Sequence, residues 1–225
     1  MDVDVMHPIS AAADAGTRAD AGTAPDAVKR PGRPRSERAD QAILDAALDA
    51  FAELGAAGVT CEGVAARAGV GKATIYRRWP GKEDLLIAAL SALKSPLPEP
   101  TGESVRDDLI AMVTVMVRDS DDPRYARQFA MLHGEGERYP RLLARYKEMA
   151  VEPRRETVRQ VIRRGIETGE LRADTDVEIA MLTLMGAVMA RMKHDYGGSA
   201  PDYAARVVDQ LLRGLAASGS PATGS

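Results

Sequence analysis

The sequence has very little cysteine, and it contains no long apolar run. Cys61 is the single cysteine among 225 residues, which excludes an internal disulfide framework and fits a reducing compartment. No apolar stretch approaches the roughly 20 residues that a membrane-spanning helix needs. The N-terminal residues also lack the continuous apolar core of a secretory signal. We therefore expect a soluble, cytoplasmic protein.

Patterns that carry catalysis or bind metals are also missing. His7, His133 and His194 lie far apart in the sequence and show no metal-ligand spacing. There is no glycine-rich phosphate loop and no recognisable combination of nucleophile, histidine and acid. Cys61 lies beside an expected helix start, where the helix dipole would lower its pKa and favour oxidation, or it is simply a small structural residue. We expect a protein that is not an enzyme and holds no metal or cofactor.

Basic residues are concentrated in one region of an acidic chain. The formal net charge is −3, yet residues 29–94 contain 11 basic and 8 acidic residues. An excess of positive charge in one segment fits a dedicated nucleic-acid-binding module better than a diffuse affinity of the whole surface.

Helical periodicity runs through almost the whole chain, and no segment shows convincing strand alternation. We expect an all-α protein of two domains. A disordered extension covers residues 1–38, with a basic arm at 29–38; residues 39–94 form a helix-turn-helix domain, 95–217 a larger helical domain, and 218–225 a flexible tail. The helices are expected at 39–54, 60–79 (two short helices and a turn), 82–93, 104–117, 123–134, 140–167, 177–193 and 201–217. Pro153 should kink or divide the helix at 140–167.

The chain is organised around residues 60–82, TCEGVAARAGVGKATIYRRWPGK. Thr60 is a candidate N-cap for a first short helix, which Gly69 ends because glycine tolerates the left-handed conformation. Ile75 and Trp79 would face inward from a second helix at about 71–79. Between Arg67 and Lys82 there are five basic residues and no acid.

The outer face of the second helix suits insertion into a DNA major groove, since it is small at its centre and surrounded by cations and a tyrosine. For the bare pattern, a helical hairpin with a solvated basic face is an equal alternative. The pattern is longer, however. AFAELGAAGVT, VAARAGVGKATIYRRW and GKEDLL follow one another from Ala50 to Leu86, and over residues 39–93 the chain resembles the TetR family of bacterial transcriptional regulators. Gly71 departs from the serine often found there, and Arg78 from a histidine.

The resemblance implies roles for individual residues. Lys72, Ala73 and Arg77 fall at positions that face bases. Positions that meet phosphates are Thr60, Thr74, Tyr76, Arg78 and Lys82. The arm contains Gly32-Arg33-Pro34, which resembles the core of an AT-hook. Arg33 and Arg35 would then lie in the minor groove, or the segment is only a solubilising basic linker.

Eight of the ten methionines lie in the expected second domain. Each one by itself is readily explained by core packing, but methionines also line adaptable pockets. The family resemblance implies an effector pocket in this domain, for which the candidate residues are Met112, Met116, Phe129, Met149 and Met185.

The two C-terminal helices are apolar on more than one face, so part of that surface must be buried outside their own domain. The resemblance implies a four-helix interface between two copies of the chain. Its candidate residues are Met185, Gly186, Met189, Ala190, Val208, Leu211, Leu212 and Leu215.

From these features we expect a homodimeric repressor that binds a palindromic double-stranded DNA operator and is released by a small-molecule effector. An activator or a DNA-organising protein is one alternative. A small-molecule-binding helical protein without a DNA function is another, against which the basic, acid-free second helix argues.

Overall fold

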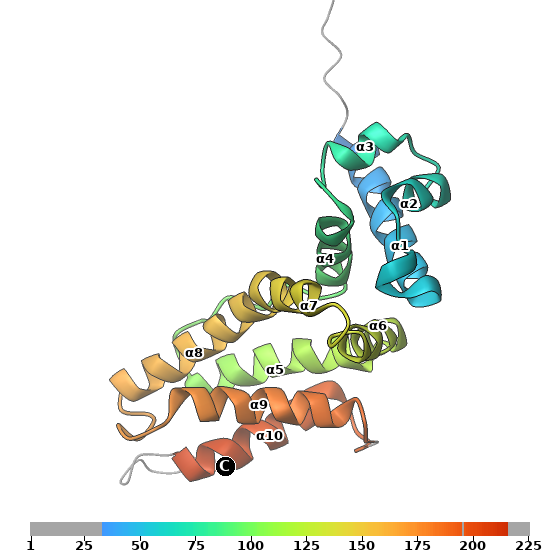
Figure 1. Ribbon diagram of the computed structural model, residues 1–225. Coiled ribbons are helices and arrows are strands. Elements are labelled where there is room, and N and C mark those ends of the chain that lie inside the picture. The colour runs from blue at the N-terminus through green and yellow to red at the C-terminus, as the bar shows by residue number, and fades with distance from the viewer. Residues whose placement is uncertain (1–32, 195, 216–225) are drawn as a thin grey trace, which may run out of the picture. The chain divides into compact units, whose positions relative to one another are not determined.

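The protein is all-helical, as expected (Figure 1). The computed structural model describes residues 33–194 and 196–215, and side chains from residue 37 onward. None of these residues lies in a β-strand. The helices are α1 (Arg33–Gly58), α2 (Cys61–Arg67), α3 (Lys72–Tyr76), α4 (Lys82–Ala92), α5 (Val105–Asp121), α6 (Pro123–Gly134), α7 (Pro140–Tyr146), the π-helix η1 (Lys147–Val151), α8 (Glu152–Glu167), α9 (Val177–Arg191) and α10 (Ala200–Leu215).

The first helix begins earlier than the sequence suggests. We expected a disordered extension up to residue 38, whereas α1 begins at Arg33. Pro34 is tolerated there because amides in the first turn of a helix have no intrahelical partner. The rest of the arm and the side chains of Arg33 and Arg35 lie outside the described residues. Gly55, the first residue after the expected helix at 39–54, interrupts α1 with φ +66°.

A first hydrophobic core joins α1, α2, α3 and α4. Ile43, Phe51, Ile75 and Leu85 are fully buried in it, as helical spacing predicts for these apolar positions. Leu132 of α6, together with Leu142 and Tyr146 of α7, also belongs to this core. The core of the helix-turn-helix domain, called the reading domain below, therefore includes side chains from beyond the predicted boundary at residue 94.

A second core lies among α5, α8, α9 and α10. It contains Met112, Val161, Leu184 and Val208, all of them buried. Gly165 permits the close packing of α8, because a Cβ atom at this position would lie 2.8 Å from Val105 Cγ2. A larger residue would push α8 away from α5.

Pro153 divides the expected helix at 140–167, as predicted, although the form of the division was not foreseen. The chain passes from α7 through the five-residue π-helix η1 into α8, whose first turn contains Pro153. Proline has no amide hydrogen to donate to the preceding turn, so the hydrogen-bond pattern must change there. π-Helical turns inside helices are frequent at functional sites.

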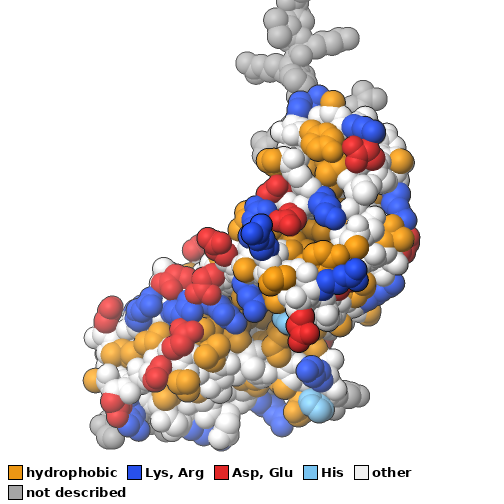
Figure 2. Space-filling model, in the orientation of Figure 1, with side chains coloured by type: hydrophobic (Ala, Val, Ile, Leu, Met, Phe, Trp, Pro, Cys, Tyr) orange, Lys and Arg blue, Asp and Glu red, His pale blue; other side chains and the backbone are white. Residues whose placement is uncertain are grey.

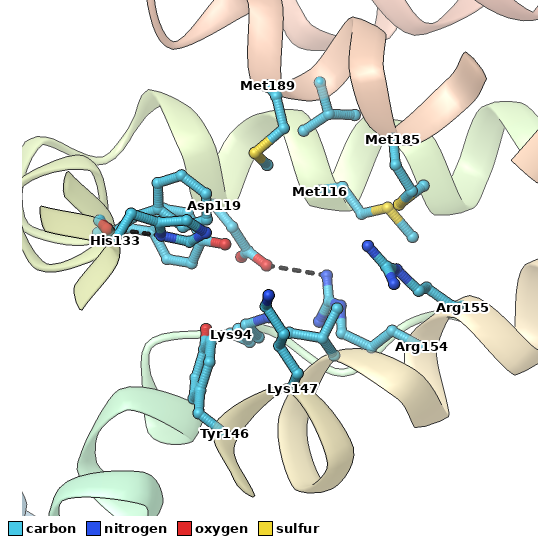
Figure 3. A pocket seen from close by; sticks show the side chains of 14 residues that line it. Lys94, Met116, Asp119, His133, Tyr146, Lys147, Arg154, Arg155, Met185 and Met189 are labelled. Atoms are coloured by element: carbon cyan, nitrogen blue, oxygen red, sulfur yellow. Dashed lines mark hydrogen bonds and ion pairs between the residues drawn. The ribbon is translucent and has the colours of Figure 1, made fainter. Parts of the chain in front are cut away.

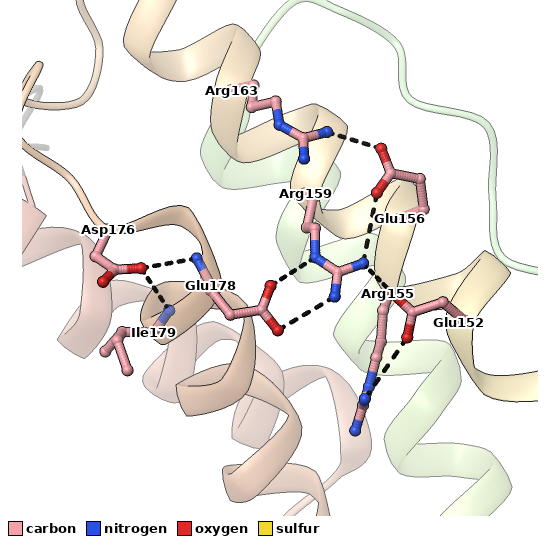
Figure 4. A network of polar contacts seen from close by, with 8 residues as sticks. All are labelled: Glu152, Arg155, Glu156, Arg159, Arg163, Asp176, Glu178 and Ile179. Atoms are coloured by element: carbon pink, nitrogen blue, oxygen red, sulfur yellow. Dashed lines mark hydrogen bonds and ion pairs between the residues drawn. The ribbon is translucent and has the colours of Figure 1, made fainter. Parts of the chain in front are cut away.

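A network of charged side chains fastens α8 to α9 (Figure 4). Arg159 is buried and donates to Glu178 Oε2 and Oε1 at 2.8 and 3.2 Å, and to Glu152 Oε1 at 2.6 Å. Its hydrogen bonds to Glu178 and Glu152 raise the pKa of Arg159. Around it, acidic and basic side chains are interleaved on the face that carries α8 (Figure 2). None of the described helices is both long and apolar enough to cross a bilayer.

Candidate nucleic-acid interface and internal cavity

The second and third helices form the helix-turn-helix that the sequence predicts. Thr60 caps α2 by accepting a hydrogen bond from the Gly63 amide at 3.0 Å. Gly69 takes φ +65° in the turn, where a Cβ atom would be strained. Val70 then donates to the Ala65 carbonyl at 3.0 Å. Ile75, with no exposed surface, anchors α3 in the first core, so the opposite side of α3 faces outward.

The outward side of α3 consists mostly of exposed side chains. Lys72, Ala73, Tyr76 and Arg77 are exposed there, and Thr74 is half-buried. Gly71 begins the helix without a side-chain cap, although its carbonyl accepts a hydrogen bond from the Thr74 amide at 2.8 Å. Sequence reasoning thus oriented this helix correctly.

An acidic residue on α2 engages two of these side chains. Tyr76 donates its hydroxyl hydrogen to Glu62 Oε1 at 3.2 Å, and Lys72 Nζ lies 3.7 Å from the same oxygen. A hydrogen bond to its own backbone amide lowers the pKa of Glu62, and contacts with Tyr76 and Lys72 add to this effect. The Glu62 charge in turn raises the pKa of Tyr76. Glu62 is therefore an ionised counter-charge beside the reading surface, and sequence reasoning missed it.

Two of the predicted phosphate-contacting cations have partners inside the protein. Arg78 Nε lies 2.5 Å from Asp40 Oδ1, and its Nη1 donates to the Thr74 carbonyl at 3.1 Å. Lys82 donates to the Ala56 carbonyl at 3.1 Å near the end of α1. Both side chains therefore help to hold the helices of this domain together.

The environment of Cys61 distinguishes the two alternatives that the sequence left open. The thiol is buried, and this burial raises its pKa. A raised pKa leaves little thiolate, so the structural alternative is the one that fits. No group of three or more His, Cys, Asp or Glu side chains in the described part of the chain is placed to hold a metal ion.

A cavity of about 280 Å³ lies among α5, α6, α7, η1, α8 and α9 (Figure 3). Its apolar lining comes from methionine, valine and aromatic side chains: Met116, Tyr125, Phe129, Tyr146, Val151, Met185, Val188 and Met189. The remaining lining residues are Lys94, Asp119, His133, Lys147, Arg154 and Arg155. A concave apolar space with a few polar groups is the usual form of a small-molecule site.

The predicted pocket residues separate into two groups. Met116, Phe129 and Met185 line the cavity. Met112 does not, because it is fully buried in the second core. Met149 does not either, since it is 58% exposed on the π-helix. Sequence reasoning also missed the four cations of the lining, whose main signal was the density of basic residues around Pro153.

Helix α6 faces both the cavity and the reading domain. Phe129 and His133, four residues apart, line the cavity. From the other side of the helix, Gln128 donates to the Leu48 carbonyl at 2.9 Å, and Arg124 lies 2.9 Å from Asp45 Oδ1. Glu135, just after α6, accepts from the Ala56 amide at 2.9 Å.

Helix α4 is likewise held from the cavity side. Arg145, directly before the cavity residue Tyr146, donates to Asp84 Oδ1 at 2.6 Å in the first turn of α4. At the other end, Lys94 itself lines the cavity two residues beyond α4.

Of the residues predicted for the dimer interface, some lie on the surface of α9 and α10 and others lie in the cavity lining or the core. Ala190, Leu211 and Leu215 line a groove between α9 and α10, and Gly186 is exposed. Leu212 is half-buried and packs against the second core. Met185 and Met189 line the cavity, while Val208 is fully buried in its own domain and has no surface for a partner.

Two large apolar side chains of α9 complete this surface. Ile179 and Leu182 are 60% and 41% exposed, and neither was among the residues selected from the sequence.

A helix-turn-helix with a basic outer face, joined to a helical domain that encloses a cavity, defines a DNA-binding transcriptional regulator. Two family descriptions match the chain: "Bacterial regulatory proteins, tetR family" over residues 43–89, and "Tetracyclin repressor-like, C-terminal domain" over residues 98–211. The chain belongs to the TetR family of helix-turn-helix transcriptional regulators.

Similar proteins carry the same description. The HTH-type transcriptional regulator YdeS of Bacillus subtilis is 35% identical over 163 residues, which are 72% of this chain and 81% of YdeS. The HTH-type transcriptional regulator AqdR of Rhodococcus erythropolis is 29% identical, over 71% of this chain and 77% of AqdR.

Solved structures share the fold. A TetR transcriptional regulator from Agrobacterium tumefaciens superposes with a TM-score of 0.62 at 19% identity, covering 80% of this chain and 95% of the other. A TetR-family regulator from Mesorhizobium loti gives 0.59 at 21% identity, covering 81% and 98%.

Proposed function

We propose that the protein is a homodimeric repressor that binds a palindromic operator and leaves it when a small molecule occupies the cavity. The observation that carries this proposal is the double contact of α6 and α7. Each helix lines the cavity on one side and hydrogen-bonds a helix of the reading domain on the other, through Gln128 to α1 and Arg145 to α4. A molecule that spreads the cavity lining must therefore move or strain those contacts.

The reading helix has a specific division of roles in this proposal. Lys72, Ala73 and Arg77 face base edges in the major groove, and Thr60, Thr74 and Tyr76 meet phosphates. Arg78 and Lys82 also face phosphates, using donors that their contacts with Asp40 and Ala56 leave over. The same contacts hold both side chains in place before DNA arrives.

Selecting the genomic DNA fragments that bind the purified protein tests the proposed binding to a palindromic operator. The selected fragments should share an inverted repeat, because a two-fold symmetric dimer reads two half-sites about one helical turn apart. Lys72→Ala and Arg77→Ala should alter the preferred sequence, and each should weaken binding by about 1–3 kcal/mol because a hydrogen bond to a base edge is removed. Tyr76→Phe and Lys82→Ala should weaken binding to all sequences alike. The opposite assignment of effects would refute these roles.

A second copy of the chain is the proposed occupant of the α9–α10 surface. Ala187 and Ala190 line the groove with short side chains that let a helix approach closely, while Ile179 and Leu182 expose apolar surface beside it. Because Leu182 is already exposed in one copy, Leu182→Lys should leave the fold intact and place a charge in the interface.

Sedimentation tests this interface. Leu182→Lys should shift the protein from dimer to monomer at micromolar concentration. Leu54→Lys is a matched control, because Leu54 is 52% exposed on α1 and lies outside the proposed interface. A wild-type monomer, or equal behaviour of the two variants, would contradict the homodimer.

The coupling between ligand and DNA is a difference in affinity between two arrangements of the reading domains. Typical coupling energies are about 1–3 kcal/mol. Arg145→Ala removes the hydrogen bond to Asp84 and should reduce the effect of an effector on operator binding more than it reduces effector binding itself. Parallel titrations with and without DNA measure the two effects separately.

A further inference from the structure

The cavity contains hydrogen-bond donors that the protein leaves without adequate acceptors. Lys94 is one of the residues that line the cavity (Figure 3). Its Nζ has one long contact, 3.5 Å to the Ala150 carbonyl, and lies 5.0 Å from the centre of the Tyr146 ring. An ammonium group carries three donors, so the Lys94 group is only weakly satisfied at the edge of an apolar space.

Arg155 is the second such group. Its Nε is buried and has no hydrogen-bond partner among the described residues. Its Nη1 lies 3.7 Å from Glu152 Oε2, which is too long for a good hydrogen bond. Glu152 is at the same time held by Arg159 at 2.6 Å. The Arg155 side chain is 32% exposed as a whole, but a buried N–H group without a partner costs free energy, so its Nε is a donor that a bound acceptor would satisfy.

The ion pair between Asp119 and Arg154 in the cavity lining already has its hydrogen-bond partners. Asp119 accepts from Arg154 at 3.1 Å and from the Ser95 amide at 3.2 Å, and Arg154 also donates to the Ser95 carbonyl. Asp119 is therefore already engaged by hydrogen bonds from Arg154 and the Ser95 amide. Within the part of the chain that the structure describes, it is the only carboxylate of a lining that includes four cations. Asp119 acts on Lys94 through its charge alone, and its hydrogen bonds go to Arg154 and the Ser95 amide, so it accepts from neither Lys94 nor Arg155.

The wall near these two donors is apolar. Met116 and Met185 lie beside the Arg155 guanidinium in Figure 3, and Met189 lies further along the same wall. Methionine side chains adapt to the shape of an apolar guest. The volume of about 280 Å³ is at the lower end of small-molecule sites. The complement of this cavity is a small molecule with one negatively charged group and an apolar body.

We propose that the cavity binds a small organic acid, with its carboxylate between Lys94 and Arg155 and its apolar part against Met116 and Met185. The carboxylate supplies acceptors to both cations, and such charge-assisted hydrogen bonds are stronger than neutral ones. This proposal rests on the cavity being the effector site. It adds the class of the effector and the two residues that select it.

The position of Lys94 also explains how an acid would be sensed. Lys94 follows α4 by two residues, and the adjacent Ser95 is pinned by Asp119 and Arg154. A carboxylate that draws Lys94 away from the Ala150 carbonyl therefore acts directly on the end of the helix that leads to the reading domain.

Matched pairs of acids and amides test the proposal. The probes are 3-phenylpropanoate, 4-phenylbutanoate and octanoate, each compared with its primary amide, together with inorganic phosphate as an anion without an apolar part. Binding to the full chain without DNA is measured by calorimetry at neutral pH. At least one acid should bind about 10- to 100-fold more tightly than its amide, since one or two charge-assisted hydrogen bonds distinguish them.

Three variants locate the selectivity. Arg155→Met and Lys94→Met should each reduce the preference for the acid about 10-fold or more, because each removes one charge-assisted hydrogen bond. Arg141→Met is the matched control, because Arg141 is exposed on α7 and outside the cavity lining. It should keep the preference. Circular dichroism checks that each variant is folded, and Lys94→Gln provides a polar replacement if Lys94→Met is not.

The outcomes are decisive in both directions. The proposal is overturned if no acid is preferred over its amide, if the preference survives in both cavity variants, or if phosphate binds better than every acid. Operator release is measured separately with the same acids. An acid that binds through Lys94 and Arg155 without releasing the operator would refute the effector role and leave the anion site standing.

Discussion

Replacing Glu62 with glutamine should strengthen binding to DNA, although the change weakens two contacts within the protein. Glu62 holds Tyr76 at 3.2 Å and Lys72 at 3.7 Å, and both side chains must leave it to face DNA. A negative charge beside the reading helix also repels the approaching phosphates. The change Glu62→Gln removes the charge while keeping the size of the side chain.

The expected gain is small because all three side chains are exposed. Two unit charges at 3.7 Å attract by about 1 kcal/mol in water, and exposed ion pairs contribute only about 0–1 kcal/mol after solvent and side-chain entropy are counted. Allowing for the Tyr76 hydrogen bond as well, release should become easier by about 0.5–1.5 kcal/mol, which is a gain in affinity of about 2- to 13-fold. Glu62 also lies in the first turn of α2, so a slight decrease in thermal stability should accompany the gain.

Fluorescence anisotropy on a fixed DNA duplex at several salt concentrations measures this effect. Asp49→Asn is the matched control, because Asp49 is an exposed acid of α1 that lies 3.6 Å from Arg124 of α6, away from the reading helix. It changes the net charge equally and should change affinity less. In a Tyr76→Phe background the gain from Glu62→Gln should shrink. Equal gains for Glu62→Gln and Asp49→Asn would mean that only the net charge matters, and the proposed release of Tyr76 and Lys72 would be wrong.

Three further predictions concern the network, the cavity and the arm. Arg159→Met should destabilise the fold by about 1–3 kcal/mol rather than more, because the carboxylates left behind are about half exposed and can be hydrated; thermal denaturation checks this, and a destabilisation below about 0.5 kcal/mol contradicts it. Burial, followed by repulsion from Arg154, lowers the pKa of Lys94 to about 8. Among its other charged or titratable neighbours, Asp119 opposes and Arg155 adds to this shift, and Tyr146 stays neutral because burial raises its pKa. Lys94 therefore loses its charge as the pH rises through about 8, and binding of an organic acid, followed by calorimetry, should weaken there in the wild type but not in Lys94→Met. Replacing both Arg33 and Arg35 with alanine should reduce the log–log salt slope of DNA binding by up to about 1.8, at about 0.9 for each phosphate contact; an unchanged slope would make the arm a solvated linker.

Local patterns were sufficient to predict the reading domain. The spacing of Ile75 and Trp79, the cap at Thr60 and the glycine at position 69 all act within one or two helical turns. Their consequences can be worked out without knowing what else the chain contacts. The same holds for Pro153, whose missing amide hydrogen interrupts a helix wherever it occurs.

The sequence by itself thus determined most of the helices, the orientation of α3 and the family. Only the tertiary structure decided which apolar and charged side chains share a space. Met112 and Met149 both occupy helical positions, yet one is in the core and the other on the surface, because burial depends on which distant helix packs there. Glu62 and Lys72 come together from two helices, and Lys94 and Arg155, 61 positions apart in the sequence, line one cavity. Helical periodicity describes one helix at a time and carries no information about such pairs.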